Sequence, residues 1–258
     1  MSELHLIRLR LDLPRLYELA KRRNLPNRDV DLGYLVHCQL GELIREAPPK
    51  LFALPALSRP NPRPNSALEV LAYSSVSGER LVERARTFAT PEQWKALVDG
   101  RIDSKPMPSS LPVGSEVGFE VRTCPVVRTK RKMDGGRTES GDRELDVFLL
   151  EVERHPETKP GTLDRRAIYE TWLEGRFGSS SGASLESRSV IAIRRERVLR
   201  REQGDERKAR AFDRPDVVFR GRLRVTNPER FHSSLSHGIG RHRAFGFGMM
   251  LLIPPSEA

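Results

Sequence analysis

A tyrosine and a histidine three positions apart are the first residues of this sequence that could do chemistry. Tyr34 and His37 fall within segment 30–45, where apolar residues recur at spacings of three and four and predict a helix. Positions i and i+3 of a helix are neighbours, so the phenol and the imidazole share a face. Histidine can move a proton at a 2′-hydroxyl or at a leaving 5′-oxygen, and tyrosine can orient the reacting group.

The surroundings of this pair leave two interpretations open. We expect it on the solvent side, next to Gly41 and away from the apolar stripe, which would leave room for a ligand. Arginines nearby could neutralise the charge that grows on a phosphorane. The simpler alternative is an ordinary exposed histidine beside a half-packed tyrosine. The stripe itself is formed by Leu32, Val36, Leu40 and Leu43.

A glycine-rich run at 238–248 is the second candidate site. Its glycines let the backbone turn freely and let a phosphate approach the backbone N–H groups. Phe245 and Phe247 could anchor the loop or stack on a base, and the alternative is a flexible turn packed by these aromatics. Neither a Walker loop nor a dinucleotide fingerprint fits the run. The residues predicted to contact RNA here are Gly238, Gly240, Arg241, His242, Gly246 and Gly248, and Arg243 supplies further positive charge.

A third candidate is a cluster of basic residues on both sides of a turn signal at Gly204–Asp205. This pattern predicts a β-ribbon that could grip the phosphates of an RNA stem. The competing interpretation is a mobile charged loop whose glutamates partly neutralise it. The predicted RNA-binding residues of the ribbon are Arg194, Arg197, Arg200, Arg201, Arg207, Lys208 and Arg210.

The overall charge also indicates a polyanionic partner. The 258 residues include 45 Lys and Arg against 35 Asp and Glu, a formal net charge of +10. Each cation that neutralises a phosphate releases a counterion, which favours nucleic-acid binding over a merely well-solvated surface. A DNA-binding module is less well supported, because no helix-turn-helix or zinc pattern is present.

Other function classes lack their sequence signals. No stretch approaches the roughly 20 apolar residues of a membrane span, and we expect no secretory signal from the residues at 1–5. Cys38 and Cys124 share no metal-type spacing and indicate reduced thiols of a cytosolic protein. The histidines have no ligand spacing, so we expect no metal and no cofactor.

The order of predicted elements indicates an α+β fold of two tandem ferredoxin-like, or RRM-like, βαββαβ domains. We place the domains at 1–112 and 113–258. In the first we expect strands at 6–13, 51–57, 68–74 and 101–108, and helices at 14–23, 30–45, 79–88 and 91–98. In the second we expect strands at 117–121, 145–152, 189–199, 217–225 and 249–253, helices at 163–177 and 228–236, and a basic loop at 128–142 whose composition favours disorder.

Several motifs together resemble the CasE-type endoribonucleases of type I-E CRISPR systems, within the repeat-associated RNA-binding superfamily. FEVRTCP at 119–125 is similar to the family's F-x-L-R-A-N-P strand end, and YLVH at 34–37 matches the Tyr-x-x-His of its catalytic helix. The family's strand, helix and glycine-rich loop are matched in order by FRGRLRV at 219–225, NPER at 227–230, GIG at 238–240, Arg243 and GFG at 246–248.

The resemblance implies that the chain binds a CRISPR repeat hairpin and cleaves the base of its stem without a metal. His37 would then transfer the proton, with Tyr34 as its partner at the 2′-hydroxyl. Arg243 takes the place of a lysine that neutralises charge in some members and would act in the same way, and His242 is the alternative to His37. The implied product is mature guide RNA, and the implied partners are the Cascade subunits. A non-cleaving, structural RNA-binding subunit of a CRISPR ribonucleoprotein is the alternative function.

Overall fold

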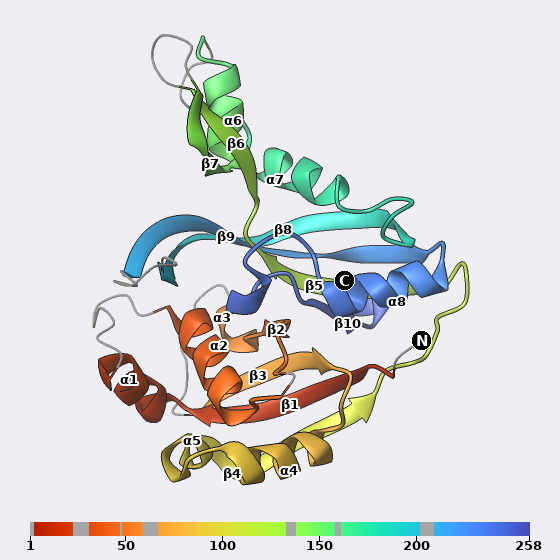
Figure 1. The fold of residues 1–258 in the computed structure, drawn as a ribbon. Coiled ribbons are helices and arrows are strands. Elements are labelled where there is room, and N and C mark those ends of the chain that lie inside the picture. Colours follow the sequence, from red (N-terminus) through yellow and green to blue (C-terminus); the bar gives the residue numbers. More distant parts are fainter. Residues whose placement is uncertain are drawn as a thin grey trace.

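The computed structural model describes residues 3–22, 31–46, 48–58, 67–132, 138–157, 161–201 and 209–258. Within these residues the chain forms two four-stranded antiparallel sheets and one two-stranded sheet (Figure 1). Each four-stranded sheet is built by one half of the chain. No helix in this part of the chain is long and apolar enough to cross a membrane.

The N-terminal sheet has the strand order β2-β3-β1-β4. Its strands are β1 (His5–Asp12), β2 (Phe52–Ala53), β3 (Ala67–Ser74) and β4 (Leu97–Pro106). Alternate residues of β1 are buried, as expected of a strand with one covered face: Ile7, Leu9 and Leu11 pack in the core. The helices of this half are α1 (Leu13–Arg22), α2 (Leu32–Leu43), α3 (Pro55–Ser58), α4 (Gly78–Phe88) and α5 (Pro91–Lys95).

The C-terminal sheet repeats the same topology with the order β10-β5-β9-β8. Its strands are β5 (Glu116–Thr123), β8 (Ala183–Arg201), β9 (Ala209–Val225) and β10 (Met250–Ile253). Helices α7 (Arg165–Glu174) and α8 (Pro228–His237) make the two crossovers, and short 3-10 turns follow at η1 (Arg243–Phe245) and η2 (Pro255–Glu257). In both halves the first and third strands are the central antiparallel pair, so the predicted tandem ferredoxin-like fold is confirmed.

An inserted unit separates β5 from α7. It consists of the hairpin β6 (Val126–Lys132) and β7 (Thr138–Asp146) and helix α6 (Val147–Arg154). Figure 1 shows this unit projecting from the C-terminal sheet, away from the N-terminal half. Two predictions were therefore wrong in the described part of 128–152: much of the expected loop is paired strand, and most of the expected strand is helix. Asp146 caps this helix by accepting a hydrogen bond from Phe148 N at 2.9 Å. The apolar run alone could not decide between strand and helix, because a short run fits both.

The expected strand at 51–57 is also mostly wrong. Only Phe52 and Ala53 pair with β3, and the chain then turns into α3. Pro55 explains the change, because proline cannot donate to a sheet ladder but suits the first turn of a helix.

The two halves share apolar core. One cluster lies between the N-terminal sheet and its helices, whereas a second combines Leu4, Leu51, Ala53 and Tyr73 with the buried residues of the C-terminal half. The Tyr73 hydroxyl donates a hydrogen bond to the Met250 carbonyl at 2.9 Å. The segment between the sheets spans 107–115, and the domain division at 112/113 stays a prediction.

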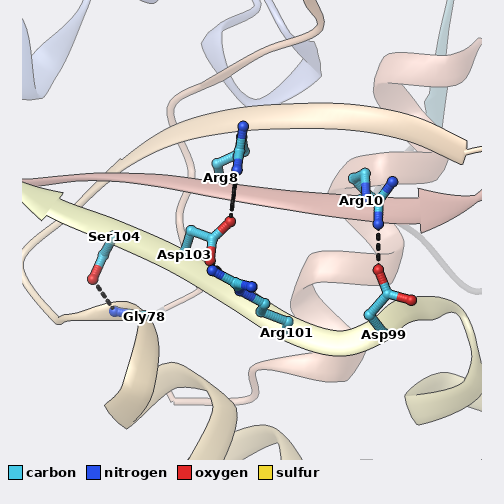
Figure 2. A network of polar contacts seen from close by, with 7 residues as sticks. All are labelled: Arg8, Arg10, Gly78, Asp99, Arg101, Asp103 and Ser104. Atoms are coloured by element: carbon cyan, nitrogen blue, oxygen red, sulfur yellow. Dashed lines mark hydrogen bonds and ion pairs between the residues drawn. The ribbon is translucent and has the colours of Figure 1, made fainter.

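Arginines and aspartates of β1 and β4 form ion pairs on the polar side of the N-terminal sheet (Figure 2). Arg8 bonds to Asp103 at 2.9 Å, Arg101 pairs with the same carboxylate, and Arg10 pairs with Asp99. Hydrogen bonds from Arg8 and Arg101 lower the pKa of Asp103. These exposed arginines therefore already have carboxylate partners.

Candidate active site

Helix α2 and the glycine-rich loop meet at Phe245. The Phe245 ring stacks on Tyr34 with centroids 6.1 Å apart and meets the His37 ring edge-on at 5.6 Å. A Cβ atom on Gly33 would lie 2.1 Å from the Phe245 carbonyl oxygen, so only glycine permits this approach. Asp31 caps the helix by accepting from Tyr34 N at 2.9 Å. The two candidate sites of the sequence are therefore one place in the structure.

The expected solvent-side position is wrong for Tyr34 but not for the whole face. Tyr34 is 8% exposed and belongs to the N-terminal core, whereas His37 is only partly buried and no atom lies within 4 Å of a Cβ built on Gly41. The glycine-rich loop covers the Tyr34 end of the face. Helical periodicity could not reveal this, because the covering segment lies far away in the sequence.

The glycines of the loop have the positive φ angles that left-handed backbone requires: 71° at Gly238, 75° at Gly240, 81° at Gly246 and 79° at Gly248. The Gly248 N–H donates to the Arg122 carbonyl at 2.7 Å, and the Gly238 N–H donates to Ser234 at 2.9 Å. These two N–H groups serve the protein itself rather than standing open to a phosphate. Contact of the loop glycines with RNA stays a prediction.

Two basic residues of the loop, Arg241 and His242, are held by a carboxylate that the sequence did not single out. Glu144 of β7 accepts from Arg241 Nε at 2.7 Å and lies 2.9 Å from His242 Nε2 and 3.5 Å from an Arg214 nitrogen. The hydrogen bond with His242, followed by that with Arg241, lowers the pKa of Glu144 to about 2. No spacing signal linked Glu144 to a loop so distant along the chain.

Arg243 and His242 differ in their environment. Arg243 is exposed and donates to the His237 carbonyl at 2.7 Å, so its guanidinium lies at the surface beside the loop. The His242 side chain is 11% exposed and is paired with Glu144. Its ring packs against the Phe245 ring, with the two centroids 6.2 Å apart. Of the two, Arg243 is the accessible cation.

A buried ion-pair cluster of Arg122, Asp216 and Arg194 packs against Phe247 of the loop. The Arg122 side chain of β5 donates twice to Asp216, at 2.9 and 3.2 Å, and its guanidinium stacks over the Phe247 ring at 4.2 Å. Asp216 also accepts from Arg194 Nε at 3.0 Å, and Arg194 donates to the Leu57 carbonyl of the N-terminal half. Arg194 thus joins the two halves, and its contact with RNA stays a prediction.

The predicted basic ribbon is formed by β8 and β9. They pair antiparallel as far as Arg200 opposite Arg210 and Arg201 opposite Ala209, and Arg197 is exposed on the ribbon. For Arg200, Arg201 and Arg210 the structure describes the backbone alone, and Arg207 and Lys208 of the predicted turn lie outside the described residues. Their contacts with RNA stay predictions.

The histidines, cysteines and carboxylates form no metal site in the part of the chain that the structure describes. There, no group of three or more His, Cys, Asp and Glu side chains is arranged to hold a metal ion. Cys38 is partly buried, and Cys124 is buried.

Comparison with solved structures shows the same fold at low sequence identity. Thermus thermophilus Cse3 bound to an RNA representing a pre-cleavage complex matches with a TM-score of 0.54 and 19% identity over 98% of this chain and 100% of that one. Cas6e from Escherichia coli K-12 matches with a TM-score of 0.55 and 18% identity over 97% and 99%. A chain of a CRISPR RNA-guided surveillance complex in a pre-nicking state matches with a TM-score of 0.54 and 17% identity over 98% and 100%.

Comparison at the level of sequence gives the family. No curated protein matches the chain significantly. The model of the family described as CRISPR associated protein matches residues 4–254, which is nearly the whole chain and includes both sheets, helix α2 and the glycine-rich loop. The chain belongs to this family of CRISPR-associated proteins.

Proposed function

We propose that this chain is a metal-independent endoribonuclease that binds the hairpin of a CRISPR repeat in precursor RNA and cleaves at the base of its stem. The observation that carries the proposal is the meeting of His37 with Phe245 of the basic, glycine-rich loop at 5.6 Å. It brings a histidine on a partly open face together with a loop that carries an accessible arginine. The family and the Cse3 and Cas6e folds support the same activity.

The proposed reaction is an in-line attack of a 2′-hydroxyl on the adjacent phosphorus. The 2′-oxygen forms a bond to phosphorus as the bond to the 5′-oxygen breaks, which leaves a 2′,3′-cyclic phosphate and a free 5′-hydroxyl. The attacking hydroxyl loses a proton and the leaving oxygen gains one, and His37 transfers a proton in this exchange. Arg243 neutralises charge on the phosphorane, and the Tyr34 hydroxyl orients the 2′-hydroxyl.

The ribbon of β8 and β9 and the loop are proposed to hold the RNA. Arginine suits this task because its planar guanidinium pairs with phosphate through two hydrogen bonds. After cleavage the chain is proposed to keep its product and join a Cascade complex, since one matching fold belongs to a CRISPR RNA-guided surveillance complex.

The test is incubation of the purified chain with a repeat hairpin RNA in EDTA. We expect one cut with a cyclic phosphate at the new 3′ end, and no cut when the 2′-hydroxyl at the scissile nucleotide is replaced by hydrogen. A requirement for a divalent metal, or cleavage of the deoxy substrate, would contradict the mechanism.

The second candidate is a structural RNA-binding subunit that does not cleave. The observation that favours it is the basic β8/β9 ribbon, which could bind a stem without any chemistry. Intact RNA after long incubation, together with tight and salt-sensitive binding, would support this alternative.

A further inference from the structure

Glu144 lies where the inserted hairpin meets the glycine-rich loop. Its side chain is 8% exposed, and Arg241, His242 and Arg214 converge on it from the loop and from β9. A carboxylate so well shielded from water is stable as an anion only when it is paired and hydrogen-bonded. The pairing of Glu144 with Arg241 and His242 therefore connects the inserted hairpin to the loop.

The loop residue that Glu144 holds has a strained backbone. His242 has φ of 58°, and a non-glycine residue in this left-handed region persists only when its surroundings fix it. The His242 carbonyl accepts from Phe245 N at 2.8 Å and so begins the η1 turn. By holding the His242 ring, Glu144 thus fixes the start of the turn that presents Phe245.

Phe245 passes this constraint to the candidate catalytic helix. Its ring lies 5.6 Å from the His37 ring and 6.1 Å from the Tyr34 ring. The path Glu144, His242, Phe245, His37 is a continuous series of contacts from β7 to α2. The His37 ring is therefore linked to the Glu144 carboxylate through two intervening side chains, His242 and Phe245.

The same contact determines what His242 can do. A carboxylate only accepts hydrogen bonds, so the His242 Nε2 atom 2.9 Å away must carry the proton between them. That nitrogen is therefore engaged inside the protein, and the His242 side chain is only 11% exposed. His242 is thereby suited to supporting the loop rather than to exchanging a proton with RNA.

We propose that Glu144 is a positioning residue of the cleavage site, which acts through His242 and the Phe245 turn to orient His37. The inference rests on the proposed function and adds to it a role for the inserted hairpin. It also assigns His242 to the same support.

The test compares the single-turnover cleavage rate and the RNA dissociation constant of the full-length wild type and Glu144→Gln. We expect the rate to fall about 10- to 100-fold, as small misplacements of reacting groups do, while the dissociation constant changes less than about threefold. A lower cleavage rate with an almost unchanged dissociation constant would not follow from a merely structural defect, because partial unfolding would weaken RNA binding as well. Glu144→Gln combined with His242→Ala should be no slower than the slower single variant, because the two residues act as one unit.

Glu120→Gln is the matched control. Glu120 of β5 makes a partly buried ion pair with Arg220 of β9 at 2.7 Å in the C-terminal sheet, away from the loop residues that Glu144 holds. We expect this variant to cleave at the wild-type rate. An equal fall in both variants would overturn the positioning role, because it would reflect general loss of stability.

The outcomes separate this inference from the proposed function. Wild-type rate in folded Glu144→Gln overturns the role of Glu144 and leaves the nuclease standing, whereas intact RNA with the wild type overturns the nuclease. If the variant does not fold, histidine ¹⁵N–¹H NMR of the wild type gives the answer. A proton on His242 Nε2 supports the assignment, and an unprotonated Nε2 overturns it.

Discussion

At the scale of single residues, Tyr34 and His37 share a helix face but have different tasks. Tyr34 is buried and stacks on Phe245, whereas His37 meets the same ring and keeps part of its surface open. A side chain that exchanges a proton with a substrate must be reachable by that substrate, and His37 is the less buried of the two. The tyrosine contributes to stability through its ring, and its proposed part in the reaction depends on the hydroxyl alone.

Two variants of Tyr34 separate these contributions. Tyr34→Ala removes the stacked ring and should lower the free energy of unfolding by roughly 3–5 kcal/mol, as other aromatic truncations in cores do. Tyr34→Phe keeps the ring and should cost about 1 kcal/mol or less. Urea denaturation measures both values, and a cleavage assay of Tyr34→Phe then isolates the hydroxyl. Equal destabilisation by the two variants would contradict the packing role.

The Glu144 carboxyl predicts a pH dependence of stability. Its pKa is about 2 in the folded chain, against an ordinary value of 4.5, because His242 and Arg241 stabilise the anion. A lowered folded-state pKa means that this stabilisation is complete above pH 4.5 and is lost as the pH falls towards 2. The difference in unfolding free energy between wild type and Glu144→Gln should therefore be constant near neutral pH and shrink in acid.

Urea denaturation of both proteins over a pH series checks this expectation. The difference between the two curves removes the contribution of all other carboxylates. If the difference in unfolding free energy grew as the pH fell, it would contradict the pairing of Glu144 with His242 and Arg241.

A residue could be predicted from the sequence where its partners lie close to it along the chain, but not where they are remote in the sequence. His37 and the basic loop residues were recognisable by type, by local spacing and by resemblance. Glu144 and Asp216 were not, because their partners are remote in sequence and are brought near only by the folded sheet. Phe245 was recognisable as an anchor of the loop, but its contact with His37 needed the structure.

At the scale of elements, the approach of α2 to the loop is the feature that assembles the site. Gly33 permits it, because a Cβ atom there would lie 2.1 Å from the Phe245 carbonyl oxygen. Gly41 on the same helix offers a matched control, because a Cβ atom there would have no neighbour within 4 Å.

The two glycines should respond in opposite directions to the same substitution. Gly33→Ala must push the helix from the loop, so we expect lower stability and a loss of cleavage of about 10-fold or more, as misplaced reacting groups give. Gly41→Ala should raise the free energy of unfolding by about 0.5–1 kcal/mol, the usual gain in a helix interior. Thermal or urea denaturation and the cleavage assay measure these effects. Full activity in Gly33→Ala would contradict the role of this approach.

The elements themselves were predictable where the hydrophobic pattern was long and regular. The alternation in β1 and the stripe of α2 were both found, with ends that differ by one or two residues. The run at 145–152 was not, because a helix cap at Asp146 outweighed an apolar pattern that also fits a strand. Short runs contain too few residues for their period to decide.

At the scale of the whole molecule, the shared core predicts that the two halves unfold together. Tyr73 and its neighbours pack among residues of the C-terminal half, and Arg194 donates to the Leu57 carbonyl across the junction. Burial raises the pKa of Tyr73, whose hydroxyl bonds to the Met250 carbonyl. Separating the halves would expose this core and leave these polar groups without their partners.

The two tryptophans of the chain allow a direct test of this cooperativity. Trp94 lies in the N-terminal half, and Trp172 lies in the C-terminal half, where it stacks on Phe219. In Trp172→Phe and in Trp94→Phe, fluorescence reports on one half and circular dichroism on the whole chain. We expect coincident urea midpoints by both probes in each variant. Separate midpoints would instead indicate independent domains.

In the proposed reaction, His37 transfers the proton and His242 supports the loop. The most direct test measures single-turnover cleavage of a repeat hairpin in EDTA by wild type, His37→Ala and His242→Ala, together with RNA affinity. We expect His37→Ala to lose about 10²- to 10⁴-fold in rate, the usual contribution of a general acid or base, with nearly unchanged affinity and a smaller loss in His242→Ala. Full activity of His37→Ala, or the larger loss in His242→Ala, would contradict these two roles.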